Sequence, residues 1–398
     1  MSMMPGMSTV LRALRAAYGL AMALVCTISL WACSDSGVGE GGTGTFASGP
    51  ITGFGSLFVA GVKFDQQDAV LDAEDEDASP TFAQLQPGMV VAVDAGAVQV
   101  QPDGRRSANA QRIRLIGSSL GPVTDVSLLG RSLRVLGTRV RFNSATIIDE
   151  SIRERLRLGQ SLAGQVVEVW GYADPRLPGF VATFMQLRTD SPAIYKARGL
   201  VRSVSGTEVV IGEQRFDFSG LGALPQAGDL VRVGVDATAG AQPWPVRRWS
   251  RLTESVSGEG IRVDIEGIVT AVTDARRFRV NGVPVQLSAD TADLAVGGYV
   301  SVTGVWRAGA LQADSLQIED EARQESREFR WEGSVSSLDA TGGRLIVTTD
   351  TGRSATVTYD SSTSFNNGTV AQLSNGAVVE VRGRFADGTL SALSITFR

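Results

Sequence analysis

Two tryptophans and two arginines stand close together in the stretch Trp244-Pro-Val-Arg-Arg-Trp249. Indole rings and guanidinium groups stack on sugar rings and on bases, so Trp244, Arg247, Arg248 and Trp249 are the candidate ligand-binding residues of the chain. The alternative is packing within or between modules, because Trp supplies a large apolar area wherever it lies. In a regular strand, Trp244 and Trp249 would point to opposite faces.

The densest group of carboxylates is Asp72-Ala-Glu-Asp-Glu-Asp77, with Asp65 and Asp68 upstream. Carboxylate oxygens suit Ca²⁺, but the segment lacks the glycine and the spaced ligand order of an EF-hand loop. We therefore expect a solvated loop and no bound metal, as for most runs of like charge. A solvated helix face is expected at Arg153-Glu-Arg-Leu-Arg157, which follows good N-terminal helix residues.

The chain contains no histidine, the usual general base near neutral pH and the commonest metal ligand. A Ser-His-Asp mechanism is therefore excluded. Lys63 and Lys196 are the two lysines, and neither lies in a Ser-Lys motif. We therefore expect that the protein is not an enzyme and binds no cofactor. Paired carboxylates hydrolyse glycosides without histidine, so a glycan-processing enzyme stays as an alternative.

The N-terminus has the three zones of a secretory signal peptide. Two arginines precede an apolar stretch over residues 16–32, which ends on the small residue Ala32. We expect residues 1–32 to be a signal peptide. An uncleaved anchor helix is the alternative, although the apolar run is at the short edge for crossing a bilayer.

A cysteine follows the apolar stretch directly. Leu30-Trp-Ala-Cys33 resembles the lipobox of bacterial lipoproteins, which implies cleavage before Cys33 and lipid attachment to its thiol and new N-terminus. Residues 33–48 are rich in Gly and polar residues and are expected to form a flexible tether. Ser34 after the cysteine implies a protein bound to the outer membrane and facing the periplasm.

Charge narrows the choice of partners. The formal net charge is −5 and becomes more negative when the signal peptide with its two arginines is removed. An acidic surface disfavours nucleic acid, because phosphate binding needs clustered Lys and Arg. We expect membrane attachment through Cys33, an envelope protein or polysaccharide as the partner, and no nucleic acid.

Two sets of glycines recur in step along the chain. Each glycine of the first set begins a stretch of alternating apolar residues, and each of the second set precedes one of these stretches. The first set is Gly88, Gly164, Gly228, Gly297 and Gly376, and the second is Gly53, Gly121, Gly199, Gly267 and Gly333. The period-two pattern indicates strands, and its recurrence about every 70 residues predicts tandem modules.

Each module is expected to contain about five strands. Hairpins are predicted at Val59–Phe64 and at Val280–Val285, where Asn281-Gly282 is a strong two-residue turn signal. A helical turn is predicted between the third and fourth strands, as at Thr291–Leu294 and Thr369–Leu373. Bulges are expected at Gly171, Gly304 and Gly383, which follow central strands.

The predicted fold is therefore all-β, a tandem array of about five small OB-like or SH3-like five-stranded barrels. The expected modules are residues 49–115, 116–190, 191–255, 256–322 and 323–398. Residues 319–328, between the last two modules, are predicted to be a short helix or a flexible spacer.

The first module also carries a family resemblance. Its opening, Gly53-Phe-Gly-Ser-Leu-Phe-Val-Ala-Gly-Val-Lys-Phe-Asp65, and the later stretches 85–93, 121–126 and 135–140 resemble a family of exported bacterial proteins made of repeated all-β domains of unknown function. The resemblance implies a β-rich envelope protein and supplies no catalytic residues.

These observations predict a non-catalytic cell-envelope lipoprotein, an array of modules that binds a partner or spaces one from the membrane. The alternatives are the glycan-processing enzyme and an OB array that binds oligonucleotides or oligosaccharides, which OB barrels commonly do.

Overall fold

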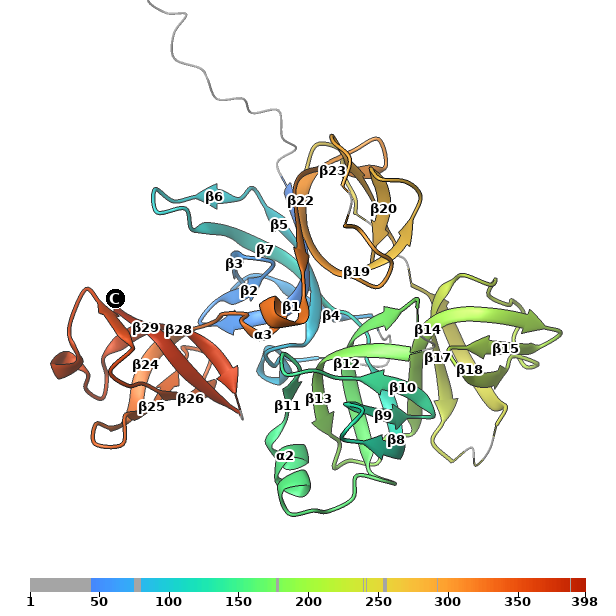
Figure 1. Cartoon of the computed structure of the whole chain (residues 1–398), viewed down its shortest axis with the longest axis horizontal. Helices are drawn as coiled ribbons and strands as arrows, with labels where there is room; N and C mark the ends of the chain where they lie inside the picture. Colours follow the sequence, from blue (N-terminus) through green and yellow to red (C-terminus); the bar gives the residue numbers. More distant parts are fainter. Residues whose placement is uncertain are drawn as a thin grey trace, which may run out of the picture. The chain divides into compact units, whose positions relative to one another are not determined.

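The computed structural model describes residues 44–74, 80–176, 179–238, 240, 242–252, 256–291, 293–386 and 388–398 (Figure 1). These residues belong to one compact unit. No helix within this described part is long and apolar enough to cross a membrane. The predicted signal peptide, Cys33 and most of the predicted tether lie outside the described residues.

Module 4 shows how each barrel is built. Its strands are β19 (Arg262–Val272), β20 (Arg277–Val280), β21 (Val283–Leu287), β22 (Tyr299–Arg307) and β23 (Ala310–Glu319). They pair in the order first, second, third, fifth, fourth and back to the first, with the third and fifth strands parallel and the other neighbours antiparallel. This is the strand order of an OB barrel.

The other four modules close in the same order. The strands of module 1 are β1 (Gly44–Phe54), β2 (Leu57–Val59), β3 (Val62–Asp65), β4 (Val70–Ala73), β5 (Val90–Gly96), β6 (Gln99–Val100) and β7 (Arg106–Leu115). Those of module 2 are β8 (Ser119–Ser127), β9 (Ser132–Val135), β10 (Thr138–Arg141), β11 (Ile147–Ile148), β12 (Val166–Asp174) and β13 (Gly179–Leu187). Module 3 contains β14 (Ile194–Ser205), β15 (Glu208–Ile211), β16 (Gln214–Asp217), β17 (Leu230–Asp236) and β18 (Trp244–Arg251). Module 5 contains β24 (Phe329–Asp339), β25 (Arg344–Thr348), β26 (Ser354–Thr358), β27 (Ser364–Asn366), β28 (Val378–Ala386) and β29 (Thr389–Phe397).

The predicted turns and bulges are confirmed. Asn281 and Gly282 have φ values of 50° and 89° and form the two-residue turn between β20 and β21. The pairing register shifts at Gly171, Gly304 and Gly383. A Cβ on Gly171 would lie 1.9 Å from the carbonyl oxygen of Val181, so only glycine allows this close approach of the two strands.

Helical turns lie between the third and fourth barrel strands in three modules. They are the 3₁₀ helices Phe82–Gln84 and Val370–Gln372 and the helix α2 (Glu150–Arg157). The turn expected at Thr291–Leu294 is wrong, since none of the described residues there is helical. The amide of Thr291 instead donates to the carbonyl oxygen of Ala275, which ties this segment to the β19–β20 turn.

The segment between modules 4 and 5 contains the short helix α3 (Glu321–Glu325). The side chain of Asp320 caps it by accepting a hydrogen bond from the amide of Arg323 at 2.8 Å. Of the two forms predicted for this segment, the structure therefore has the helix.

Strand β1 joins three of the barrels. It pairs antiparallel with β5 of its own module, parallel with β19 of module 4 and parallel with β24 of module 5. One continuous apolar core accordingly extends through modules 1, 4 and 5 and includes Trp170, Tyr172 and Phe184 of module 2. Modules 2 and 3 also have cores of their own. Each barrel still closes on itself, and β1 is the strand of module 1 on which modules 4 and 5 dock.

The position of β1 corrects the predicted tether. β1 begins at Gly44, so residues 44–48 are strand and not linker. Phe46 in this segment is 1% exposed and belongs to the shared core. The abundance of Gly and Ser around it suggested a linker, but small residues here let neighbouring strands approach closely, as at Gly49, whose Cβ would lie 3.2 Å from Glu266 Cβ.

Candidate functional site

The predicted Trp–Arg stretch forms β18 of module 3, and its two indole rings lie on the same side of the strand. The register with β17 shifts at Arg247, where a β-bulge inserts one extra residue. That residue reverses the alternation of side chains, so Trp244 and Trp249 both pack against the core of module 3. The prediction of opposite faces is therefore wrong, and both rings are engaged in packing.

The two arginines of β18 differ in their surroundings. Arg247 is exposed, and its Nε lies 2.7 Å from Asp236 Oδ2. Arg248 and Trp249 line, with Lys196 and Arg232, a hollow of about 90 Å³. The four residues named from the sequence are thus divided between a core, an exposed ion pair and a small hollow.

Part of the predicted acidic loop is engaged in contacts between modules. Asp72 lies in β4 and pairs with Arg112 of the same module at 3.3 Å. Glu74 Oε2 accepts a hydrogen bond from the amide of Gly117 at 2.6 Å and lies 3.3 Å from Arg198 of module 3. Residues 75–77 lie outside the described residues. Within the described residues, no group of three or more His, Cys, Asp or Glu side chains is placed to hold a metal ion.

The predicted solvated helix face belongs to α2, and the opposite side of this helix is buried. Ile152 is 1% exposed and lies in the core of module 2. The side chain of Asp149 caps the helix by accepting from the amide of Ile152, and its other oxygen accepts from the amide of Leu187 on β13. Arg157 pairs with Glu154 on the exposed side, so the charges there have a structural role.

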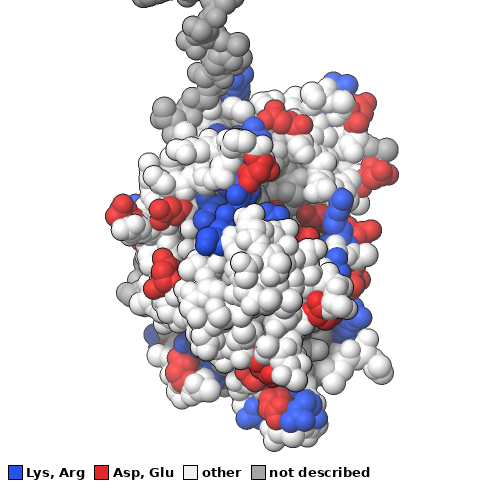
Figure 2. Space-filling view, turned by 90° about the vertical axis from the view of Figure 1, so that its left-hand side faces the viewer, with Lys and Arg blue, Asp and Glu red and all other residues white. Residues whose placement is uncertain are grey.

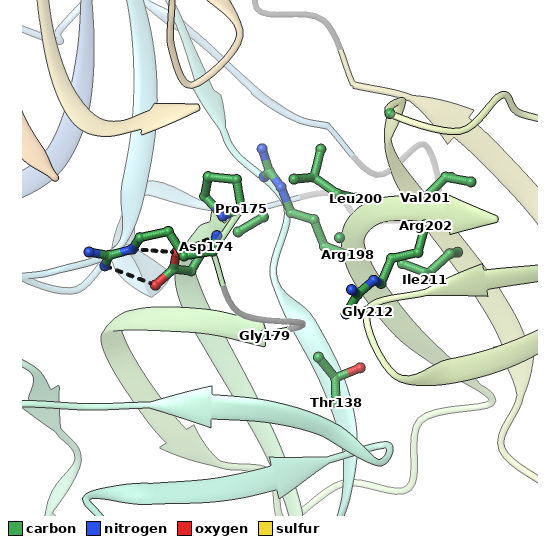
Figure 3. Close-up of a pocket in the computed structure, with 14 residues that line it drawn as sticks. Thr138, Asp174, Pro175, Gly179, Arg198, Leu200, Val201, Arg202, Ile211 and Gly212 are labelled. Atoms are coloured by element: carbon green, nitrogen blue, oxygen red, sulfur yellow. Dashed lines mark hydrogen bonds and ion pairs between the residues drawn. The ribbon is translucent and has the colours of Figure 1, made fainter. Parts of the chain in front are cut away.

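A cleft of about 220 Å³ between modules 2 and 3 is the candidate functional site (Figure 3). Module 2 contributes Thr138 and the β12–β13 segment that contains Asp174, and module 3 contributes β14 residues around Arg198 and the glycine turn at Gly212. On the module 2 side, glycine lets β10 and β13 approach closely, since a Cβ on Gly179 would lie 2.8 Å from the carbonyl oxygen of Arg139.

Positive charge predominates on the cleft wall. Asp174 is buried and is neutralised by Arg176 at 3.2 Å and Arg141 at 3.6 Å. Arg198 is 6% exposed, and its Nη1 donates to the carbonyl oxygen of Gly117 at 2.9 Å. Arg202 is exposed and has no ion-pair partner among the residues that the structure describes.

The groups on the cleft wall can bind a ligand. The cleft's one carboxylate is already paired with two arginines, and its hydroxyl group, Thr138, has no base beside it among the described lining residues. A guanidinium group, a hydroxyl group and an apolar wall at Pro175 and Leu200 can hold a polar group of a ligand. The sequence did not indicate this site, because its residues lie far apart in the chain and belong to two modules.

Two carboxylates do come together elsewhere, around Arg327. Its Nη2 atom lies 3.3 Å from a carboxylate oxygen of Glu266 and 3.4 Å from one of Glu319. The same atom donates a hydrogen bond to Tyr299 Oη at 3.1 Å. Burial raises the pKa of Glu266. A cavity of about 390 Å³ has Tyr299 and Glu319 in its wall. The guanidinium group lies between the carboxylates, where a glycosidic bond would have to bind.

Lysine contributes no nucleophile to either place. The Nζ atom of Lys63 pairs with Glu332 of module 5 and lies 5.9 Å from the centre of the Phe58 ring. Lys196 lines the small hollow in module 3.

Comparison with known proteins identifies three of the modules. One family model, described as a domain of unknown function (DUF5666), matches residues 121–183, 266–317 and 332–396, which lie in modules 2, 4 and 5. No curated protein matches the chain. The chain therefore contains a repeated domain of unknown function.

Proposed function

We propose that this chain is a non-catalytic lipoprotein of the cell envelope, attached to the membrane through lipid on Cys33, whose modules bind an envelope protein or polysaccharide. The lipobox-like sequence supports the anchor, and β1 begins a short distance after it at Gly44. An anchored chain would therefore enter the molecule at the strand of module 1 on which modules 4 and 5 dock.

The observation that carries the binding function is the cleft between modules 2 and 3. Its volume of about 220 Å³ is below the range of about 300–1,000 Å³ typical of pockets for drug-sized ligands. It suits one unit of a polymer, a sugar residue or an amino-acid side chain. Arg202 supplies a cation that has no ion-pair partner among the described residues, and Thr138 supplies a hydroxyl group.

The glycan-processing alternative has less support. Glu266 is a buried carboxylate with a raised pKa, which a general acid needs. However, Arg327 contacts both carboxylates and occupies the space between them. We therefore assign this group to the docking of modules 4 and 5 and not to catalysis.

Photo-crosslinking in the native envelope tests the proposed function. A photo-crosslinking amino acid in place of Pro175, in the wall of the cleft, is expected to give a crosslinked partner that disappears when Arg202→Gln is added. The same group in place of Arg344, an exposed arginine of module 5, is the control. Identical products from both positions, or a product that does not depend on Arg202, would contradict the proposal.

A further inference from the structure

Two arginines face each other across neighbouring strands on the outer side of module 5. Arg330 of β24 is the direct register partner of Arg382 of β28. Like charges directly opposite on antiparallel strands are destabilising. Burial, and then the nearby charge of Arg382, lower the pKa of Arg330. This pair therefore needs compensating negative charge.

The carboxylates on the same two strands, Glu332 of β24 and Glu380 of β28, already have other partners. Glu332 pairs with Lys63 and lies 3.4 Å from Arg398. Glu380 pairs with Arg398 and accepts a hydrogen bond from Arg382 Nε at 2.9 Å. Arg382 thus donates a hydrogen bond from Nε only, and its Nη1 and Nη2 atoms have no hydrogen bond to any described residue.

Arg330 lies against an aromatic ring instead of a carboxylate. Its guanidinium carbon is 5.5 Å from the centre of the Phe58 ring, on β2 of module 1. Among the described residues it has no hydrogen-bonded acid. A ring face attracts a cation but leaves the edge of the guanidinium group free to donate.

A third arginine approaches from module 1. Arg105, in the β6–β7 turn, lies 3.5 Å from Glu380. Figure 2 views the side on which module 5 is drawn in Figure 1, and it shows Lys and Arg side chains gathered in a recess beside a broad face with few charges. Five cations, Lys63, Arg105, Arg330, Arg382 and Arg398, thus surround the carboxylates of Glu332 and Glu380.

We propose that Arg330 and Arg382, with Arg105 beside them, form a binding site for a phosphate group. A tetrahedral anion with several oxygens satisfies two or three guanidinium groups at once, through the paired hydrogen bonds that Arg forms with phosphate. The site lies on module 5 and module 1, so it does not depend on the cleft between modules 2 and 3. A lipid headgroup and a soluble phosphate compound present the same chemistry.

Calorimetric titration of the full chain with inorganic phosphate, at constant ionic strength, tests the site. We expect a dissociation constant of about 1 mM or below, and a rise of at least tenfold in Arg330→Gln and in Arg382→Gln. Arg344→Gln, which removes an exposed arginine of the same module, is the matched control and should change it less than twofold. Arg382→Lys keeps the positive charge but loses the planar guanidinium group, and it should also weaken phosphate binding. This variant tests the site even if Arg330→Gln does not fold.

Cosedimentation with vesicles separates the two sources of phosphate. The Cys33→Ser chain, which lacks the expected lipid attachment site, is mixed with phosphatidylcholine vesicles with and without phosphatidic acid. Binding that needs both phosphatidic acid and Arg330 identifies a lipid headgroup, and binding of inorganic phosphate alone identifies a soluble compound. No heat of binding up to about 10 mM phosphate, or equal weakening in Arg344→Gln, overturns the proposal.

Discussion

Gly53 of module 1 lies so close to Arg330 of module 5 that a Cβ on the glycine would be 2.1 Å from the carbonyl oxygen of Arg330. The parallel pairing of β1 with β24 brings the two backbones together at this point. The glycine at the start of the first module thus allows another module to dock.

Gly53→Ala is expected to destabilise the protein by about 1–3 kcal/mol, because the added methyl group meets backbone that cannot move without separating the two modules. The midpoint of urea unfolding measures the change. Gly220→Ala is the control, since a Cβ there would have no neighbour within 4 Å. Equal effects of the two substitutions would show that the close approach has no energetic consequence.

The stability of the protein should depend on the protonation of Glu266. Burial raises its pKa in the folded state above the ordinary value of 4.5, so the folded protein holds this proton more tightly than the unfolded chain. The stability from this group is complete below about pH 4.5 and is lost as the pH rises through the raised pKa.

Glu266→Gln should remove this dependence. Urea midpoints of the wild type should fall relative to those of the variant as the pH is raised from 4.5 toward neutrality. Glu208→Gln, at a half-buried position of module 3 paired with Arg215, provides the comparison. Parallel profiles for the wild type and Glu266→Gln would mean that the buried carboxylate does not titrate as its surroundings require.

Module 3 offers a direct comparison of packing with ligand binding. Trp249→Ala should lower the free energy of unfolding by about 2–3 kcal/mol, because the ring packs against the core and contacts Phe218. The loss is smaller than for a fully buried Trp, since this ring is half-buried. Arg247→Ala, two positions away and exposed, should cost less than about 1 kcal/mol. Thermal unfolding of both variants checks the order. Loss of partner binding in Trp249→Ala at unchanged stability would instead favour a role in recognition.

Membrane attachment should depend on one side chain. Cys33→Ser is expected to move the protein from the membrane fraction to the aqueous fraction, because the acyl chains on the cysteine supply the hydrophobic anchor, about 0.8 kcal/mol for each buried CH₂. Fractionation of cells followed by immunoblotting measures the distribution. Retention of the variant in the membrane fraction would favour an uncleaved anchor helix.

The barrel repeat was predictable because its signals are local. Alternating apolar residues, the turn at Asn281-Gly282 and the bulge glycines Gly171, Gly304 and Gly383 each act over a few neighbours, and all of them are confirmed. The bulge at Arg247 has no glycine to mark it, so the sequence could not show that Trp244 and Trp249 share one face.

The candidate sites required knowledge of how modules dock. Glu74 and Arg198 belong to modules 1 and 3, and nothing in the spacing of the two residues indicates their contact. The pairing of Arg330 with Arg382 follows from the register of β24 and β28, which only the fold defines. The strand nature of residues 44–48 was hidden for the same reason, since these residues pair with β19, which lies more than 200 positions later.

The central claim is that modules 4 and 5 dock on one strand of module 1, β1. Hydrogen–deuterium exchange of the full chain, followed by mass spectrometry, tests it most directly. We predict that peptides from β1 are among the slowest to exchange, because this strand is paired on both edges and its residues are nearly all buried. Exchange in β1 as fast as in the exposed two-residue strand β6 would contradict the docking of modules 4 and 5 on this strand.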